Sequence, residues 1–590
     1  MAKKRSAPSR RLRSSGQVAE AADKSLRSYL VGAVPILNHF LKRLDLEALL
    51  ERHLPAEDAR TTVPTATGLL LLVRNVLVSR EPIYGVADWA YGYAPDLLDL
   101  SETRLSALND DRLGRCLNRL FRATGPELIL DVVRQAIREF GLRLDELHND
   151  STSISFYGQY PDAAQEKTLQ GRKTHAITWG HSKDHRPDLK QLLYILTVTD
   201  DGGVPVYFTS ASGNVSDDPT HIGTWDLLCQ LVGSPDFLYV ADCKLASTAN
   251  LDHITRCGGR FVTVLPGSRR EDAEFRGRLS KSGPTDWQHM YDVTRTKTDE
   301  RGQEITVVTD QLRVWAKEQT TSEGYRLLWY HSSRKAELDR LARAARTERA
   351  LLDLVALRER LEGPKTRFRE RVKVEQAVAE ILRQRDVERW VRGQVEVEET
   401  KHYHPTARGR PGPRTRYLCD VQTRFTLSAQ VDQEQLERET LGDGVFPLIT
   451  NQRQMSPEEL LRAYKRQPLI EKRFSQFKSD FSVAPVYLKE VSRIQGLLCV
   501  YFLALLVQTL LERELRQAME REGVEHLPLY GEQRDCRRPT TRKVIDAFEP
   551  VQRHVLSLPD GQQEVLGTQL TPRQRQILKL LGISADTYDR

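Results

Sequence analysis

The strongest constraint on the fold is a short apolar run that ends in an acid, Phe237-Leu-Tyr-Val-Ala241 followed by Asp242. Five apolar residues without a polar interruption predict a strand that is buried on both faces, as in the parallel part of an α/β sheet. Open sheets of this kind hold their chemistry at the carboxyl ends of the strands. Asp242 is therefore predicted to lie at a functional edge of a buried sheet.

The segments around this run extend the pattern. A strand carrying Asp150 comes first, and two further strands, Leu192–Thr199 and Val204–Thr209, are joined by the hairpin signal Asp-Asp-Gly-Gly. A helix is expected at about Thr220–Leu231, and another strand, Phe261–Leu265, follows Asp242 after a short helical segment. This is the order of elements of an RNase H-like core, in which a mixed sheet brings two acids together.

A third acid, Glu471, stands in the stretch Tyr464–Lys478 among several basic residues. Apolar residues recur there with helical spacing, which predicts a core-facing stripe. They are Ile470, Phe474, Phe477 and Phe481. A carboxylate at the rim of a core, surrounded by cations, suits an acid that holds a metal next to phosphate; from this stretch alone, a solvated face of mixed charges is the other interpretation. Because Pro468 lacks a backbone donor, a helix that begins at Ser456 is expected to end or kink there and a second one to begin.

A large insertion separates the two parts of this expected core. We expect strands first, then two charged helices, then two more strands around a basic loop. The strands are Tyr291–Val293, Ile305–Thr309, Leu312–Ala316, Tyr325–Tyr330, Gln394–Glu398 and Tyr417–Leu427, and the helices are Lys335–Glu362 and Val374–Arg383. The loop Thr406–Arg416 interleaves Arg408, Arg410, Arg414 and Arg416 with Gly and Pro. It could grip DNA phosphates or be a solvated loop.

The fold class is therefore α/β: an RNase H-like catalytic core, a mixed sheet flanked by helices, interrupted by a mixed β/α insertion. In chain order we expect a basic disordered tail (1–27), an N-terminal helical domain with possible DNA binding (28–141), the first part of the core (142–266), the insertion (267–444), the second part of the core (445–515) and a helical C-terminal region (516–590). The core is expected to resume at the strand Val445–Thr450, and beyond Ser456 the chain is expected to be helical to its end. Expected helices outside the core are Val34–Leu50, Thr67–Val78, Glu127–Phe140 and a terminal packing helix, Thr571–Ser584.

Composition narrows the class of protein. The formal net charge of +7 permits a nucleic-acid partner. None of the seven cysteines forms a Cys-x-x-Cys pair, so a zinc ribbon or disulfide framework is disfavoured and a reducing cytoplasm fits. The N-terminus has no apolar segment of a signal peptide. The longest apolar run, Leu497–Val507, is too short to span a bilayer and predicts a buried helix, so no membrane partner is expected.

Several runs together resemble a DDE transposase of a bacterial insertion sequence, in the superfamily marked by a Tyr-Arg-Glu-Lys signature. The residues that carry the resemblance are Leu108–Gly114, Asp150-Ser-Thr, Gly180–Gln191, Gly213–Asp217, Val240-Ala-Asp242 and Tyr464…Glu471…Lys478. The run Ser182-Lys-Asp-His-Arg-Pro-Asp-Leu189 is the most specific of these, because eight residues of mixed chemistry are required by no packing rule.

The resemblance implies an enzyme that binds the terminal inverted repeats of its element, cleaves at the element ends and joins the 3′-hydroxyls to target DNA. Asp150, Asp242 and Glu471 would be its catalytic, metal-binding triad, with two Mg²⁺ (or Mn²⁺) ions per active site. Carboxylates suit this role because Mg²⁺ prefers oxygen ligands, and two ions can activate the attacking oxygen and stabilise the departing one. A homodimer on double-stranded DNA, in the bacterial cytoplasm and associated with the nucleoid, is expected by analogy.

The resemblance also implies DNA contacts, and this sequence departs from the family at one of them. In the family, Tyr464 and Lys478 lie near DNA phosphates. Gln467 stands where Arg is common, and a neutral amide cannot make the charged, bidentate contact of Arg, so Arg466 is a possible substitute. The cluster that contains Lys183, His185 and Arg186 is predicted to contact DNA or to order the neighbouring hairpin through salt bridges.

Two other functions fit the same residues. A transposase-derived DNA-binding protein without catalysis is suggested by Gln467-Pro468, although it would not need three retained acids. A host nuclease on the same fold would share the chemistry but not the element ends.

Overall fold

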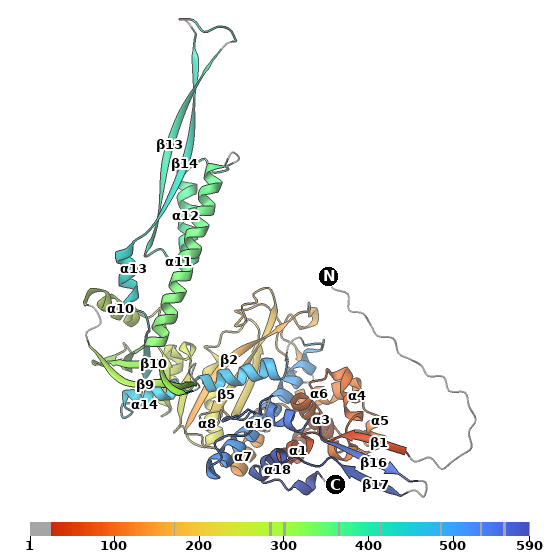
Figure 1. Cartoon of the computed structure of the whole chain (residues 1–590). Coiled ribbons are helices and arrows are strands. Elements are labelled where there is room, and N and C mark those ends of the chain that lie inside the picture. Colours follow the sequence, from red (N-terminus) through yellow and green to blue (C-terminus); the bar gives the residue numbers. More distant parts are fainter. Residues whose placement is uncertain are drawn as a thin grey trace. The chain divides into compact units, whose positions relative to one another are not determined.

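In the computed structural model, residues 25–588 are described except 170, 283–285, 299–302, 364–365, 407, 414, 484–485, 532–533 and 559–561. Most of the predicted tail therefore lies outside the described residues. The chain forms two compact units (Figure 1). The first comprises the described residues within 1–216, 227–233 and 468–590, and the second those within 217–226 and 234–467.

The sheet of the first unit consists of three long antiparallel strands. They lie in the order β6 (Pro205–Ser212), β5 (Lys190–Thr199), β2 (Glu146–Phe156). The predicted hairpin joins β5 to β6, and its two glycines have φ of 84° and 64°, a backbone region that suits glycine. The three strands predicted in this region are thus confirmed; β3 (Thr168–Leu169) and β4 (Arg172–Lys173) add a small separate pair.

A buried helix, α16 (Val491–Arg521), forms the centre of the first unit and packs against α3 (Thr65–Val78), α6 (Asp110–Ala123) and β6. By length and composition alone α16 could cross a membrane, but 94% of its most apolar window is buried within the protein. We therefore interpret it as a core helix, as the sequence predicted. Gly496 permits the close approach of α6, because a Cβ there would lie 2.4 Å from the carbonyl oxygen of Leu117.

The N-terminal helices pack around this centre. The predicted helix Val34–Leu50 is two helices, α1 (Val34–Arg43) and α2 (Leu46–His53), because the chain turns at Asp45, whose φ is +48°. The other helices here are α4 (Val86–Tyr91), α5 (Glu102–Ser106) and α7 (Pro126–Phe140). The helices predicted at Thr67–Val78 and Glu127–Phe140 are confirmed as α3 and α7.

The prediction that the chain is helical to its end is wrong. Two strands, β16 (Gln552–Ser557) and β17 (Gln563–Gly567), form a three-stranded antiparallel sheet with β1 (Ser25–Leu30). The first residues of β1 were expected to be disordered tail. These short strands are stabilised by pairing between the two ends of the chain, which a local pattern does not reveal. The helices α17 (Thr541–Phe548) and α18 (Pro572–Leu580) pack on each other and on α16, so the predicted terminal packing helix is confirmed.

The second unit contains a larger mixed sheet. Its strands lie in the order β7 (Leu238–Ala241), β8 (Arg260–Val264), β15 (Val445–Thr450), β12 (Arg326–Ser332), β10 (Glu304–Trp315), β9 (Trp287–Thr298), and the short β11 (Gln319–Thr320) pairs with β12. β7 and β8 are parallel and the other pairs antiparallel. The first strands of the insertion thus continue the sheet that β8 and β15 begin.

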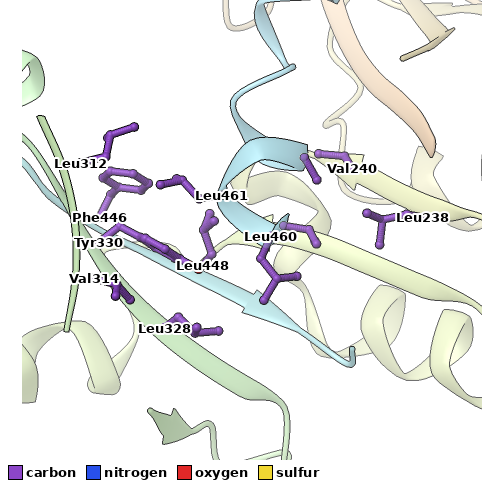
Figure 2. Close-up of a cluster of buried hydrophobic side chains, with 12 residues drawn as sticks. Leu238, Val240, Leu312, Val314, Leu328, Tyr330, Phe446, Leu448, Leu460 and Leu461 are labelled. Atoms are coloured by element: carbon purple, nitrogen blue, oxygen red, sulfur yellow. The ribbon is translucent and has the colours of Figure 1, made fainter. Parts of the chain in front are cut away.

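A compact apolar core covers one face of this sheet. The helix α14 (Pro457–Tyr464) places Leu460 and Leu461 among the side chains of the strands (Figure 2). Its N-terminus carries the predicted capping box between Ser456 and Glu459. The buried members of this core on the sheet are Leu238, Val240, Val262, Leu312, Val314, Leu328, Tyr330, Phe446 and Leu448.

The rest of the insertion is a helical pair and a long β-hairpin. The helices α11 (Ser333–Glu362) and α12 (Arg371–Arg385) confirm two predicted helices, and β13 (Val391–Pro405) and β14 (Tyr417–Val431) confirm two predicted strands, which are longer than expected. Two helices were missed, α10 (Arg270–Ser282) and α13 (Gln433–Thr440). α8 (Thr220–Val232) and α9 (Thr248–Arg256) lie where helices were expected.

Candidate active site

Asp150 occupies an unusual position on β2. Every other residue of this strand is buried, and the Asp150 side chain retains 21% of its exposure. One carboxylate oxygen accepts hydrogen bonds from the backbone N–H of Ser151 at 2.7 Å and from Nζ of Lys183 at 3.2 Å. The strand therefore exposes the carboxylate of Asp150 to solvent, while its other side chains, many of them polar, are buried.

The loop that supplies Lys183 is the specific run Ser182–Leu189. Nζ of Lys183 also donates to the carbonyl of Ser151 at 2.8 Å, and its backbone N–H donates to Oγ of Ser153 at 3.1 Å. The loop is thus attached along β2 by a charged side chain and by its backbone. This is the structural role that the sequence left open for the cluster.

The remaining residues of this loop divide into paired and exposed groups. Arg186 makes a bidentate salt bridge with Asp188, at 2.8 and 2.6 Å. His185 is exposed and adopts φ of +56°. Arg186 and His185 therefore lie at the surface, and the guanidinium of Arg186 already has a carboxylate partner.

Glu471 lies in the first turn of α15 (Pro468–Ser475), where its side chain is exposed. Pro468 begins this helix, as the sequence predicted. The helix packs on β2 and β5. In the turn that follows it, the ring of Phe477 stacks on Tyr194 of β5 with centroids 4.4 Å apart. The predicted apolar stripe is buried throughout.

The helix that carries Glu471 is fixed by a buried ionic network that the sequence did not reveal. Arg473 is 2% exposed and pairs with Glu512 of α16, which is fully buried, at 2.9 Å. It also donates to the carbonyls of Gly202 and Gly203 in the β5–β6 hairpin. Burial alone would raise the pKa of Glu512, but the neighbouring cations, Arg473 foremost, outweigh burial and hold it below its usual value. The sequence feature that could have indicated a buried ion pair is the position of Arg473, between the stripe residues Ile470 and Phe474.

Lys478 stands on a π-helical turn, η5 (Gln476–Asp480), that follows α15. The helix predicted from the spacing of Ile470, Phe474, Phe477 and Phe481 therefore changes from an α-helix to a π-turn after Ser475. The ammonium group of Lys478 pairs with the carboxylate of Asp184, in the same loop that holds Asp150 through Lys183. Asp184 is the residue that the sequence reasoning did not connect to Lys478.

Asp242 belongs to the second unit and directly follows β7, as predicted. It caps the short helix η4 (Cys243–Ala246), because Oδ1 accepts the backbone N–H of Lys244 at 3.0 Å. Its backbone carbonyl accepts a hydrogen bond from Oγ1 of Thr263 on β8 at 2.6 Å. The carboxylate is half-buried at the carboxyl end of a buried parallel strand.

The other signature residues also lie in the second unit. Tyr464 ends α14, and its half-buried ring packs near Phe446 with centroids 6.4 Å apart. Arg466 is half-buried and Gln467 is 8% exposed. The neutral amide of Gln467 therefore sits in the interior of the protein.

The donor chemistry of the three acids fits divalent metal ions. Asp150 and Asp242 are half-buried and Glu471 is exposed, and all three offer carboxylate oxygens, which Mg²⁺ prefers. Across the described part of the chain, no three His, Cys, Asp or Glu side chains are grouped closely enough to hold a metal. Asp150 and Glu471 belong to the first unit and Asp242 to the second.

Known proteins resemble this chain in its N-terminal part and, distantly, in overall structure. A family described as a domain of unknown function (DUF4277) matches residues 27–134. No curated protein matches the chain. Among solved structures, the cryo-EM structure of the piggyBac transposase synaptic complex with hairpin DNA has 12% sequence identity and a TM-score of 0.24. That match covers 51% of this chain and 59% of the other. The likeness to a transposase is weak.

Proposed function

We propose that the protein is a metal-dependent DNA transposase with an RNase H-like core. It binds the terminal inverted repeats of its insertion sequence, cleaves at the element ends and transfers the 3′-OH ends to target DNA. The observation that carries this proposal is Asp150, the one solvent-accessible position of a buried polar strand on which the helix of Glu471 packs.

The arrangement of strands supports the core assignment within each unit. β2, β5 and β6 form an antiparallel triplet that begins with an acid-bearing strand. β7 and β8 are parallel, and the first of them ends in Asp242. Both parts follow the element order that the sequence predicts for an RNase H-like core.

In this proposal, Asp150, Asp242 and Glu471 hold two Mg²⁺ or Mn²⁺ ions, which supply Lewis acidity at the phosphate when they are bound. The chain itself positions these carboxylates: Ser151 and Lys183 fix the oxygen of Asp150, and Arg473 fixes the helix of Glu471. For cleavage, a water attacks the phosphorus and displaces the 3′-oxygen of the element end, which leaves as the 3′-hydroxyl. For transfer, that 3′-hydroxyl loses its proton and attacks a target phosphodiester, whose own 3′-oxygen leaves and takes up a proton. No covalent bond to the protein is required.

The DNA contacts in this proposal are Lys478, Lys183, His185 and Arg186 in the first unit and Tyr464 and Arg466 in the second. Lys478 and Arg186 each have a carboxylate partner in the free protein, so a DNA phosphate would replace Asp184 or Asp188. The active assembly is a homodimer on paired DNA ends, in the bacterial cytoplasm at the nucleoid.

The test is cleavage of a duplex that carries the inverted repeats flanking the gene, with Mg²⁺ and with a chelator. Asp150→Asn, Asp242→Asn and Glu471→Gln should each reduce cleavage at least about a hundredfold, because each removes a metal-binding carboxylate. Exposed acids outside the site, Asp162→Asn and Glu274→Gln, serve as matched controls. If the three site variants cleave as the controls do, the assignment of the site is wrong.

A DNA-binding protein without catalysis is the second candidate, and it was motivated by Gln467. Gln467 is buried, so its neutral side chain is not exposed at the protein surface. Repeat-specific binding without any metal-dependent cleavage would favour this candidate. Absence of inverted repeats in the flanking DNA would instead favour a host nuclease.

A further inference from the structure

The hairpin of β13 and β14 has two different halves. Its base packs on α11 and α12, where Val391, Phe425 and Leu427 join a buried apolar cluster with residues of both helices. Its outer half extends beyond that helical pair (Figure 1). The described residues at 396–405 and 416–424 are all exposed, on both faces of the ribbon.

A two-stranded ribbon with both faces in water is only marginally stable by itself. The cross-strand register gives the two faces different characters. The face that continues from the buried base carries the pairs Tyr403–Cys419 and Pro405–Tyr417. Tyr403 is 62% exposed and Tyr417 49%. The ribbon thus presents aromatic side chains where no described element covers them.

Charge along the ribbon is divided between its ends. Between residues 401 and 420 the sequence carries five strongly basic residues and one acid, which are Lys401, Arg408, Arg410, Arg414, Arg416 and Asp420. Nearer the base stand three acids, Glu396, Glu398 and Glu399. Glu398 lies opposite Arg424 in the register, so it has a cation on its own ribbon. The excess positive charge is therefore concentrated at the outer end.

We propose that the outer half of this ribbon enters a groove of double-stranded DNA and that Arg408, Arg410 and Arg416 bind phosphates on the groove edges. The major groove of B-DNA admits a two-stranded β-ribbon. Arginine makes bidentate contacts with phosphate. A second copy of the chain would bring like charges together at the tips. The inference rests on the proposed function only in naming DNA as the partner.

The test measures binding of the full-length protein to a fluorescent DNA duplex in the presence of a chelator, between about 50 and about 200 mM salt. The triple variant Arg408→Gln, Arg410→Gln, Arg416→Gln should bind roughly ten- to a hundredfold more weakly, with a salt slope reduced by about two to three. The matched control, Arg349→Gln, Arg358→Gln, Arg360→Gln, removes the same charge from the exposed surface of α11 and should bind as wild type.

A second variant keeps the folded base and removes the outer half. Replacing residues 400–422 by Asn-Gly joins Glu399 to Thr423, which are opposite one another in the register. This variant should lose at least as much DNA affinity as the triple variant. The inference is overturned if the triple variant binds like its control, or if the shortened protein changes from dimer to monomer by light scattering while its DNA affinity is unchanged.

These measurements do not depend on cleavage. Ribbon-dependent binding without any cleavage would refute the proposed transposase while supporting the ribbon. If the protein cleaves DNA and its ribbon variants bind DNA normally, the proposed transposase is supported and the role of the ribbon is refuted.

Discussion

The buried pair of Arg473 and Glu512 should be the most sensitive point of the first unit. Replacing Arg473 by Met keeps an unbranched side chain of comparable length but removes the charge. Glu512, which is fully buried, still accepts hydrogen bonds from Gln476 at 2.9 Å, Arg516 at 3.3 Å and the backbone N–H of Thr541 at 3.3 Å, and Lys472 remains a neighbouring cation. The carbonyls of Gly202 and Gly203 also lose the hydrogen bonds that the Arg473 guanidinium donates to them.

The expected magnitude follows from these contacts. Removing one partner of a buried ion pair costs about 3–5 kcal/mol, because the remaining charge is left without compensation. Arg516 still compensates part of the Glu512 charge, which favours the lower end, whereas the two orphaned carbonyls add about 1 kcal/mol each. We expect Arg473→Met to lower the free energy of unfolding by about 5 kcal/mol.

A double-mutant cycle gives the sharper test. The double variant Arg473→Met, Glu512→Met leaves no unpaired carboxylate, so its loss should be smaller than the sum of the two single losses by about 2–3 kcal/mol. Urea unfolding gives the free energies, and hydrogen exchange of α15 and α16 peptides assigns the change to the first unit. Arg521→Met, the same substitution at the exposed end of α16, is the control. A single-variant loss below about 1 kcal/mol, or additive losses, would refute the argument.

Two further predictions concern the packing of the first unit. Burial lowers the pKa of His175 to about 4, against a raising influence of Glu166. An unfolded histidine titrates near about 6.5, so the unfolded chain binds the proton first and His175 costs stability progressively as the pH falls from about 6.5 to about 4. His175→Gln should therefore lose about 2 kcal/mol less stability than wild type between pH 7 and pH 5, measured by urea unfolding; equal losses would contradict this. Gly496→Ala should cost about 2 kcal/mol or more, because its Cβ would meet the Leu117 carbonyl at 2.4 Å, whereas Gly277→Ala, with open space around it in α10, should be neutral or stabilising in the same assay.

Local patterns in the sequence predicted much of the sheet. The apolar run before Asp242, the Asp-Asp-Gly-Gly turn and the capping box at Ser456 are short-range signals, and each appears at its expected place. The strands β1 and β16 could not be predicted in this way, because they pair across almost the whole chain. The continuation of the sheet through β12 and β15 was missed for the same reason, although both strands were expected separately.

The sequence predicted the residues of the candidate site but not the side chains that hold them in place. Asp150 and Glu471 could be identified from their runs, whereas the partners that fix them, Lys183 and Arg473, make contacts with residues far away in the sequence. Helical periodicity indicates that Arg473 lies next to the buried stripe. It cannot show that the partner of Arg473 is Glu512, a buried residue of α16. Periodicity misses buried charged residues, because an apolar pattern identifies only apolar side chains. A buried charge requires an ionic partner, which can lie far away in the sequence.

The run Ser182–Leu189 shows how a site can be written into a sequence without any periodic signal. Lys183 holds Asp150, the next residue, Asp184, holds Lys478, and Arg186 closes the loop on Asp188. Each contact requires a different residue type at a fixed position, so no secondary-structure propensity selects the run and a substitution at any of these positions breaks a different contact. Because the loop links β2 to the π-turn after α15, it sets the position of Lys478 relative to Asp150 within the first unit. The contacts of this loop therefore account for its residues of mixed chemistry in this order, which packing alone does not require.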